Sequence, residues 1–301
     1  MKATTETSGS WDLSIASYDS VFFPVNQDGM AMSVVFKSDG TKMYIYGYGL
    51  KKVYQYSLST AWDLSTASYD SVSFAVSGQG GTFSIGITFS YNGTKMYLVS
   101  QNPPATVYQY SLSTAWNLST ASYDSISFAV AGQSTIPWSI AFKPDGTKMY
   151  MSTNSGYMYQ YSLSTAWNLS TASYDSVSFA TVGTRGIIFK PDGTKMYMIT
   201  GSDYVYQYSL STAWNLSTAF YDSVSFLVSG QDTFPSGLAF KSDGTKMYVV
   251  GYNNDKVHQY SLSETVYATS STFESDSLEI SLSASGDKLP MISPGYTEPV
   301  G

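Results

Sequence analysis

Apolar and polar residues alternate along most of this chain in short segments that recur in the same order. Alternation with a period of two is typical of β-strands that bury one face. In the third copy Asp145-Gly146 joins two such segments, and an Asp-Gly step between apolar runs indicates a tight hairpin turn. We therefore predict antiparallel strands A to D in each copy. In the third copy they correspond to "SIAFK" (139–143), "TKMYMS" (147–152), "YMYQYSLS" (157–164) and "YDSVSFA" (174–180).

Five copies of this unit follow one another with a period of about 50 residues. The phrase "DGTKMY" begins at Asp39, Asp145, Asp192 and Asp243, with "NGTKMY" at Asn92. The phrase "QYSLS" begins at Gln55, Gln109, Gln160, Gln207 and Gln259. Four antiparallel strands repeated at this spacing are typical of a β-propeller blade. The sequence thus predicts an all-β, five-bladed β-propeller over residues 1–263.

The N-terminal segment predicts how the ring closes. Strand D has an additional copy before the first strand A, in "WDLSIASYDSVFF" (11–23). We expect a strand over residues 18–25 to be the fourth strand of the last blade, paired with the strand C that ends near Ser263. A ring tied in this way leaves no open edge. Over residues 264–301 the pattern decays, and a degenerate strand, an appended hairpin or a Pro/Gly-containing tail all fit.

Two phrases carry a resemblance to known propellers. "FKPDGTKMY", at residues 142–150 and 189–197, resembles the "SPDGKRLYV" phrase of YVTN/WD40-like propellers. "YSLSTAWDLSTASY", at residues 56–69, resembles the repetitive propellers of marine phage tail or virion proteins and of bacterial surface proteins. The resemblance spans residues 11–263 and implies a location in a virion or at a cell surface. It implies no particular chemistry, because propellers host enzymes, lectins and scaffolds alike.

Composition narrows the classes of partner. Charged residues make up only 12% of the chain, its net charge is -7, and its only arginine is Arg185. Nucleic-acid binding by counterion release needs clustered basic residues, so we expect no nucleic-acid partner. The absence of cysteine excludes disulfides, zinc-thiolate sites and thiol nucleophiles. We expect no cofactor. The first residues and the rest of the chain lack long apolar runs, so we also expect no membrane insertion and no secretory signal.

Comparison of the five copies separates two faces of the ring. The A–B turns and C–D connectors are nearly uniform and share one face, whereas the B–C and D–A loops differ between blades and share the other. Binding residues concentrate on loops held by a rigid scaffold, so the variable face is the candidate recognition surface. Candidate aromatic contacts are Tyr46, Tyr48, Trp138, Tyr157, Tyr204, Phe234 and Tyr252. Candidate polar contacts are Asn102, Asn154, Asp203, Asn253 and Asn254.

Several residues that suggest chemistry have simpler structural interpretations. His258 takes the place that tyrosine holds in the other blades, which indicates an aromatic replacement in strand C. The aspartate of "DGTKMY" becomes Asn92 in one blade, which suits a turn and not a calcium site, so we expect no metal. Asn and Asp alternate before "LS", which favours an N-cap or an Asx-turn over glycosylation. The aspartates of "YDS" and the lysines of "GTKMY" are expected to form a polar network inside each blade.

We therefore expect a non-enzymatic recognition or structural propeller that presents its variable face to a glycan or protein partner. A purely architectural scaffold, docking other subunits through the recurring face, is one alternative. A glycan-acting hydrolase is another, since a glycosidase needs only two suitably spaced carboxylates. Its candidate carboxylates would be Asp28, Asp203, Asp232 and Asp255.

Overall fold

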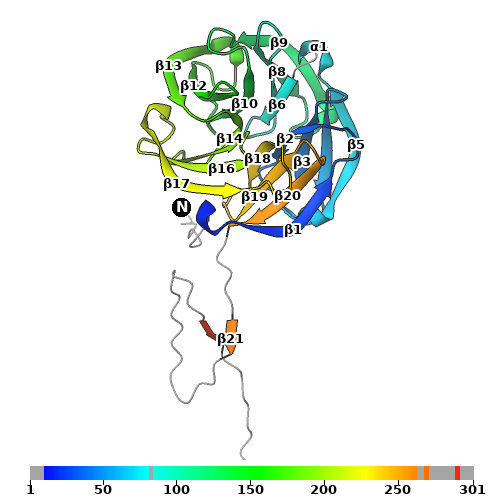
Figure 1. The fold of residues 1–301 in the computed structure, drawn as a ribbon. Coiled ribbons are helices and arrows are strands. Elements are labelled where there is room, and N and C mark those ends of the chain that lie inside the picture. Colours follow the sequence, from blue (N-terminus) through cyan, green and yellow to red (C-terminus); the bar gives the residue numbers. More distant parts are fainter. Residues whose placement is uncertain (1–9, 81–83, 263–267, 271–288, 292–301) are drawn as a thin grey trace, which may run out of the picture.

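The protein is a ring of five four-stranded antiparallel sheets around a central axis (Figure 1). The computed structural model describes residues 10–80, 84–262, 268–270 and 289–291. The first blade consists of β2 (Ala31–Phe36), β3 (Lys42–Gly47), β4 (Lys52–Leu58) and β5 (Ala67–Ala75). The second consists of β6 (Ser84–Phe89), β7 (Lys95–Ser100), β8 (Thr106–Leu112) and β9 (Ala121–Ala129). The third consists of β10 (Pro137–Phe142), β11 (Lys148–Thr153), β12 (Tyr157–Leu163) and β13 (Ala172–Ala180). The fourth is β14 (Thr184–Phe189), β15 (Lys195–Thr200), β16 (Tyr204–Leu210) and β17 (Ala219–Leu227).

The fifth blade closes the ring with the N-terminal strand, as the sequence predicts. It consists of β18 (Pro235–Phe240), β19 (Lys246–Gly251), β20 (Lys256–Ser261) and β1 (Ser17–Pro24). β1 runs antiparallel to β20, from Ser17 opposite Ser261 to Pro24 opposite Lys256. Trp11 N also donates to Gly244 O (3.0 Å), which ties the start of the chain to the A–B turn of this blade.

Short helices and two short strands complete the described residues. A single turn of α1 (Ser77–Gly80) lies between the first and second blades. β21 (Ala268–Ser270) and β22 (Leu289–Met291) pair in parallel, and the rest of the predicted tail, 264–301, lies outside the described residues. One 3-10 helix precedes each strand D: η1 (Leu13–Ile15), η2 (Leu64–Thr66), η3 (Leu118–Thr120), η4 (Leu169–Thr171) and η5 (Leu216–Thr218).

A bulge in every strand D builds the predicted polar network. In the first blade Tyr56 opposes Tyr69 and the next pair is Gln55 with Val72, so Asp70 and the residue after it bulge out of the ladder. Asp70 accepts from Lys42 Nζ (2.9 Å) and from Gln55 Nε2 (2.7 Å). Burial raises the pKa of Asp70, but these hydrogen bonds and the lysine charge outweigh it and lower the pKa. The corresponding Lys–Asp distances in all five blades are 2.8–3.0 Å.

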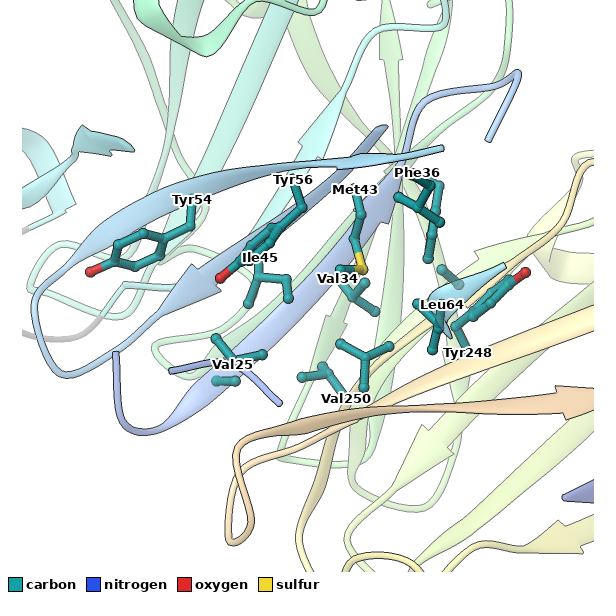
Figure 2. Packing of buried hydrophobic residues seen from close by; sticks show 14 of the residues in the cluster. Val25, Val34, Phe36, Met43, Ile45, Tyr54, Tyr56, Leu64, Tyr248 and Val250 are labelled. Carbon is teal, nitrogen blue, oxygen red and sulfur yellow. The ribbon is translucent and has the colours of Figure 1, made fainter. Parts of the chain in front are cut away.

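The C–D connector joins each blade to the one before it in the ring. Trp62 stacks on Phe36 of its own blade (5.3 Å between ring centroids), and its carbonyl accepts from Tyr248 Oη of the fifth blade (2.6 Å). Leu64 N donates to Gln259 Oε1, also of the fifth blade (3.2 Å). Figure 2 shows Leu64 and Tyr248 beside the apolar side chains that fill this junction. We call this set of contacts the joint.

The joint is the same at all five junctions. The other tyrosine hydroxyls that donate to a tryptophan carbonyl are those of Tyr44, Tyr97, Tyr150 and Tyr197. The other glutamines that accept from a connector are Gln55, Gln109, Gln160 and Gln207. Gly40 (φ 75°) is required because a Cβ there would lie 2.3 Å from the indole of Trp62. The predicted capping is also present, since Asp63 and its equivalents accept from a backbone N–H two residues later.

Candidate functional site

The B–C and D–A loops meet at one end of the ring, as the comparison of the copies predicts. Asp28 of a D–A loop accepts from Leu50 N of a B–C loop (2.9 Å) in the first blade. In the fifth blade Asp232 accepts from Asn254 N (3.0 Å), and Asn254 Nδ2 donates to Gln231 O (2.6 Å). These carboxylates therefore hold the loops together. We call this end the variable face, and the end with the joints the recurring face.

The D–A loops share more structure than their sequences suggest. A glutamine in four of them accepts from a strand-C tyrosine hydroxyl at 2.7–3.3 Å: Gln27, Gln79, Gln133 and Gln231. The D–A loop of the fourth blade is shorter and has no such glutamine. That shortening brings an arginine directly to the start of β14. The fourth blade thus differs most from the others at the centre of the variable face.

A β-bulge at the start of every strand A forms a ring of side chains around the axis. In each A–B pair the register shifts at the second residue of strand A. Bulges re-aim side chains and are frequent at the rims of barrels and beside active sites. The five bulge residues, which we call the mouth ring, are Met32, Ile85, Trp138, Arg185 and Ser236. All five line a central cavity of about 250 Å³.

Only two members of the mouth ring are accessible. Met32, Ile85 and Ser236 are buried, whereas Trp138 and Arg185 are half-buried. Arg185 Cζ lies 3.5 Å from the ring centroid of Phe234 and 5.8 Å from that of Trp138. The guanidinium is therefore flanked by aromatic rings from both neighbouring blades, a favourable cation–π geometry.

The guanidinium has few hydrogen-bond partners. Its Nη1 donates to Pro235 O at 3.4 Å, a long hydrogen bond. Arg185 Nε and Trp138 Nε1 are buried and have no partner within the part of the chain that the structure describes. Burial lowers the pKa of Arg185, and the carboxylates of Asp203 and Asp232 act in the opposite direction. The sequence comparison did not include Arg185 among the candidate contacts.

Besides Trp138, three predicted contacts gather near this arginine. Phe234 packs against Tyr252 (4.9 Å between ring centroids), next to the stacked guanidinium. Asp203, in a B–C loop, is half-buried; burial and the charge of Asp232 raise its pKa, while Arg185 opposes the rise. Together with Trp138 these residues form a cluster of aromatic and charged groups from the third, fourth and fifth blades.

The other predicted contacts are dispersed. Tyr48 stacks under Lys51 Nζ (3.6 Å) at the first blade, and Asn102 is half-buried in the second. Tyr157 and Tyr204 begin strand C and pack against tyrosines two residues later. Asn154 and Asn253 are exposed, whereas Asn254 holds its own loop in place.

Tyr46 requires a correction. It lies inside β3 and is fully buried, so it cannot be a surface platform. The physical reason is that strand B is packed on both faces, between its own blade and the next one. An aromatic residue at the end of strand B therefore belongs to the core, although in the sequence it stands next to the B–C loop.

The structure gives the suspected chemical residues structural contacts. His258 is buried, and its Nε2 lies 3.2 Å from Asn254 Nδ2. Asp255 Oδ1 accepts from Ala31 N (3.0 Å), which ties the fifth blade to the first. Over the described ranges no group of three or more His, Cys, Asp or Glu side chains could hold a metal ion. No helix among the described residues is long and apolar enough to cross a membrane.

Comparisons with known proteins give distant matches among solved structures. Two solved structures that match are described as putative 6-phosphogluconolactonases, from Bacteroides uniformis (15% identity) and Bacteroides fragilis (14% identity), each with a TM-score of 0.45. The alignments cover 66% and 68% of this chain but only 55% and 58% of theirs. At this distance the likeness carries no argument about activity. No family model and no curated protein matches.

Proposed function

We propose that this protein is a non-enzymatic binding propeller that holds a glycan or a protein partner on its variable face. The observation that supports this proposal is the contrast between the faces. The joints of the recurring face are built from the same residues five times, while the mouth ring holds a different residue in every blade. A ring that served only as a frame would not need five different side chains around its axis.

The chemistry of the cluster fits such a ligand. Trp138, Phe234 and Tyr252 offer flat apolar faces, and aromatic rings with a polar edge are the residues on which recognition surfaces most depend. A location in a virion or at a cell surface belongs to the same proposal and rests on the repeated phrases of the sequence.

The test is binding of the full chain to a glycan array and to isolated virion or surface proteins. Trp138→Ala and Tyr252→Ala are expected to weaken binding about tenfold, the usual loss for an aromatic anchor. Phe220→Ser is the matched control: Phe220 is 54% exposed on the outer strand β17, and serine stands at this position in the other blades. It is expected to bind normally.

Two results would contradict the proposal. Tight association with a subunit that neither aromatic variant weakens would indicate an architectural scaffold docked through the recurring face. Hydrolysis of a bound glycan that is lost in Asp203→Asn would indicate a hydrolase.

A further inference from the structure

Arg185 differs from the lysines that form ion pairs within the blades. The lysines that open strand B pair with aspartates inside each blade, and the lysines before the A–B turns pair with turn aspartates. Arg185 is in none of the ion pairs found within the described ranges, although it is the only arginine of the chain. It lies instead at the mouth of the central cavity, in the only blade whose D–A loop is shortened.

The side chain is held against Phe234 and uses few of its donors within the described residues. Its Cζ lies 3.5 Å from the ring centroid of Phe234, and the ring of Trp138 lies farther away, at 5.8 Å. Of its five N–H donors, one makes a long hydrogen bond to Pro235 O, and Nε has no partner among the residues that the structure describes. A planar fork that is held against a ring and poor in acceptors suits a bidentate oxyanion.

The surroundings limit how much negative charge a ligand can carry. The chain carries a net charge of -7, and Asp203 and Asp232 act electrostatically on Arg185. This field repels polyanions and doubly charged phosphates most strongly, so an anion with one charge is repelled least and is the one that the guanidinium can still hold. The cavity of about 250 Å³ runs along the strands A from the mouth ring to Trp167 and Trp214 of the recurring face. Since this whole volume is below the roughly 300–1,000 Å³ of sites that enclose a drug-sized ligand, a ligand at the mouth ring can insert only its end.

We propose that Arg185 binds the carboxylate of an acidic sugar residue, of the uronic-acid class, at the end of a glycan. Trp138 flanks that carboxylate and packs against a C–H face of the sugar, while Phe234 holds the guanidinium in place. This inference rests on the proposed function and specifies its ligand. An acidic peptide has the same carboxylate but lacks the flat C–H face that the aromatic cluster fits, so we commit to the glycan.

The experiment is calorimetric titration of the full chain with a disaccharide that carries one galacturonic acid at its non-reducing end, and with the same disaccharide after its carboxylate has been reduced to an alcohol. We expect binding of the acid, no binding of the neutral sugar, and a loss of about tenfold or more in Arg185→Lys, which keeps the charge but not the fork. Binding should weaken as salt is raised. Phe220→Ser again serves as the control, and the melting temperature of each variant checks its fold.

A second pair of variants keeps the test independent of the arginine. Thr233 is exposed and precedes Phe234. Thr233→Glu adds a negative charge and is expected to weaken binding of the acidic sugar. Thr233→Lys adds a positive charge and is expected to strengthen it.

Several outcomes would overturn the inference. Equal binding of the acidic and neutral sugars, or an unchanged affinity in Arg185→Lys, would remove the carboxylate from the argument while leaving a glycan-binding propeller. Binding of a glutamate-rich peptide but of neither sugar would replace the glycan by a protein. If no glycan or protein binds in a manner sensitive to Trp138→Ala, the proposed function fails as well.

Discussion

At the scale of single residues, one glutamine per blade explains why "QYSLS" recurs without change. Gln160 is buried; its Nε2 donates to Asp175 of its own blade (2.8 Å) and its Oε1 accepts from Leu216 N of the next (2.9 Å). One amide thus satisfies two groups that belong to different blades. Leaving either group unpaired costs roughly 1–3 kcal/mol, so a residue that lacks both the donor and the acceptor of glutamine should destabilise the ring.

His258 makes the stability of the protein depend on pH. Burial, with a smaller effect from Lys256, lowers its pKa from 6.5 to about 4, while Asp232 acts in the opposite direction. The unfolded chain therefore binds more protons than the folded one between these values. The free energy of unfolding should fall by up to about 3 kcal/mol as the pH drops from 6.5 to 4.

The variant His258→Tyr should remove this dependence. Tyrosine occupies the same place in the other blades, and in the first blade Tyr54 Oη donates to Asp28 (3.1 Å), the equivalent of Asp232. Urea unfolding at a series of pH values measures the effect; both proteins keep the same carboxylates, so their difference isolates the histidine. An equally steep loss of stability in the variant would disprove the assignment.

The candidate site could be predicted only in part. Trp138, Phe234, Tyr252 and Asp203 were found because the loops that hold them differ between blades. Arg185 was missed because a lone arginine next to a short loop carries no pattern, and the bulge that re-aims it leaves no mark in the alternation. Counting back four residues from the phenylalanine that ends each strand A would have aligned the mouth ring.

At the scale of elements, the repeated segments predicted every strand of the ring, and the additional copy of strand D predicted β1. They did not predict the bulges. The bulges in strand D and the connectors before them depend on single residues with positive φ, such as Ser71 (59°) and Trp62 (67°). Neither tryptophan nor serine favours this conformation in isolation. The surrounding joint and the Lys–Asp–Gln network impose it.

Strand β1 should be indispensable. Removing residues 1–24 deletes Trp11 and Leu13 from the core and leaves Lys246 and Gln259 without Asp19. The loss of several kcal/mol should lower the melting temperature by more than about 10 °C. Phe22→Ser is the control, because Phe22 is 46% exposed on the same strand and serine is the repeat residue there. A shortened chain that melts like the full one would refute closure by β1.

At the scale of the whole molecule, the ring should fold equally well whichever C–D connector is interrupted by the chain ends. We call this interrupted connector the seam. The blades other than the fifth connect a leucine to a tryptophan through Ser-Thr-Ala, as in 210–214, whereas in the fifth blade Leu262 and Trp11 belong to opposite ends of the chain. A permuted chain would link Leu262 to Trp11 through Ser-Thr-Ala and begin at Ala213. This moves the same seam by one blade.

We expect the permuted chain to melt within about 5 °C of a linear chain of residues 10–262, because every joint has the same contacts. Calorimetry on the two chains measures the difference. A permuted chain that fails to fold would show that the native seam has a special role.

Because the five joints are interchangeable, none of them specifies which two blades it connects. Only the order of the peptide chain decides which blade sits beside which. A blade can therefore be exchanged for another, together with its loops and its residue in the mouth ring. The neighbouring blades then form the same joint contacts as before. The frame and the displayed residues can change independently, so a new binding surface can be assembled from existing blades without a new fold.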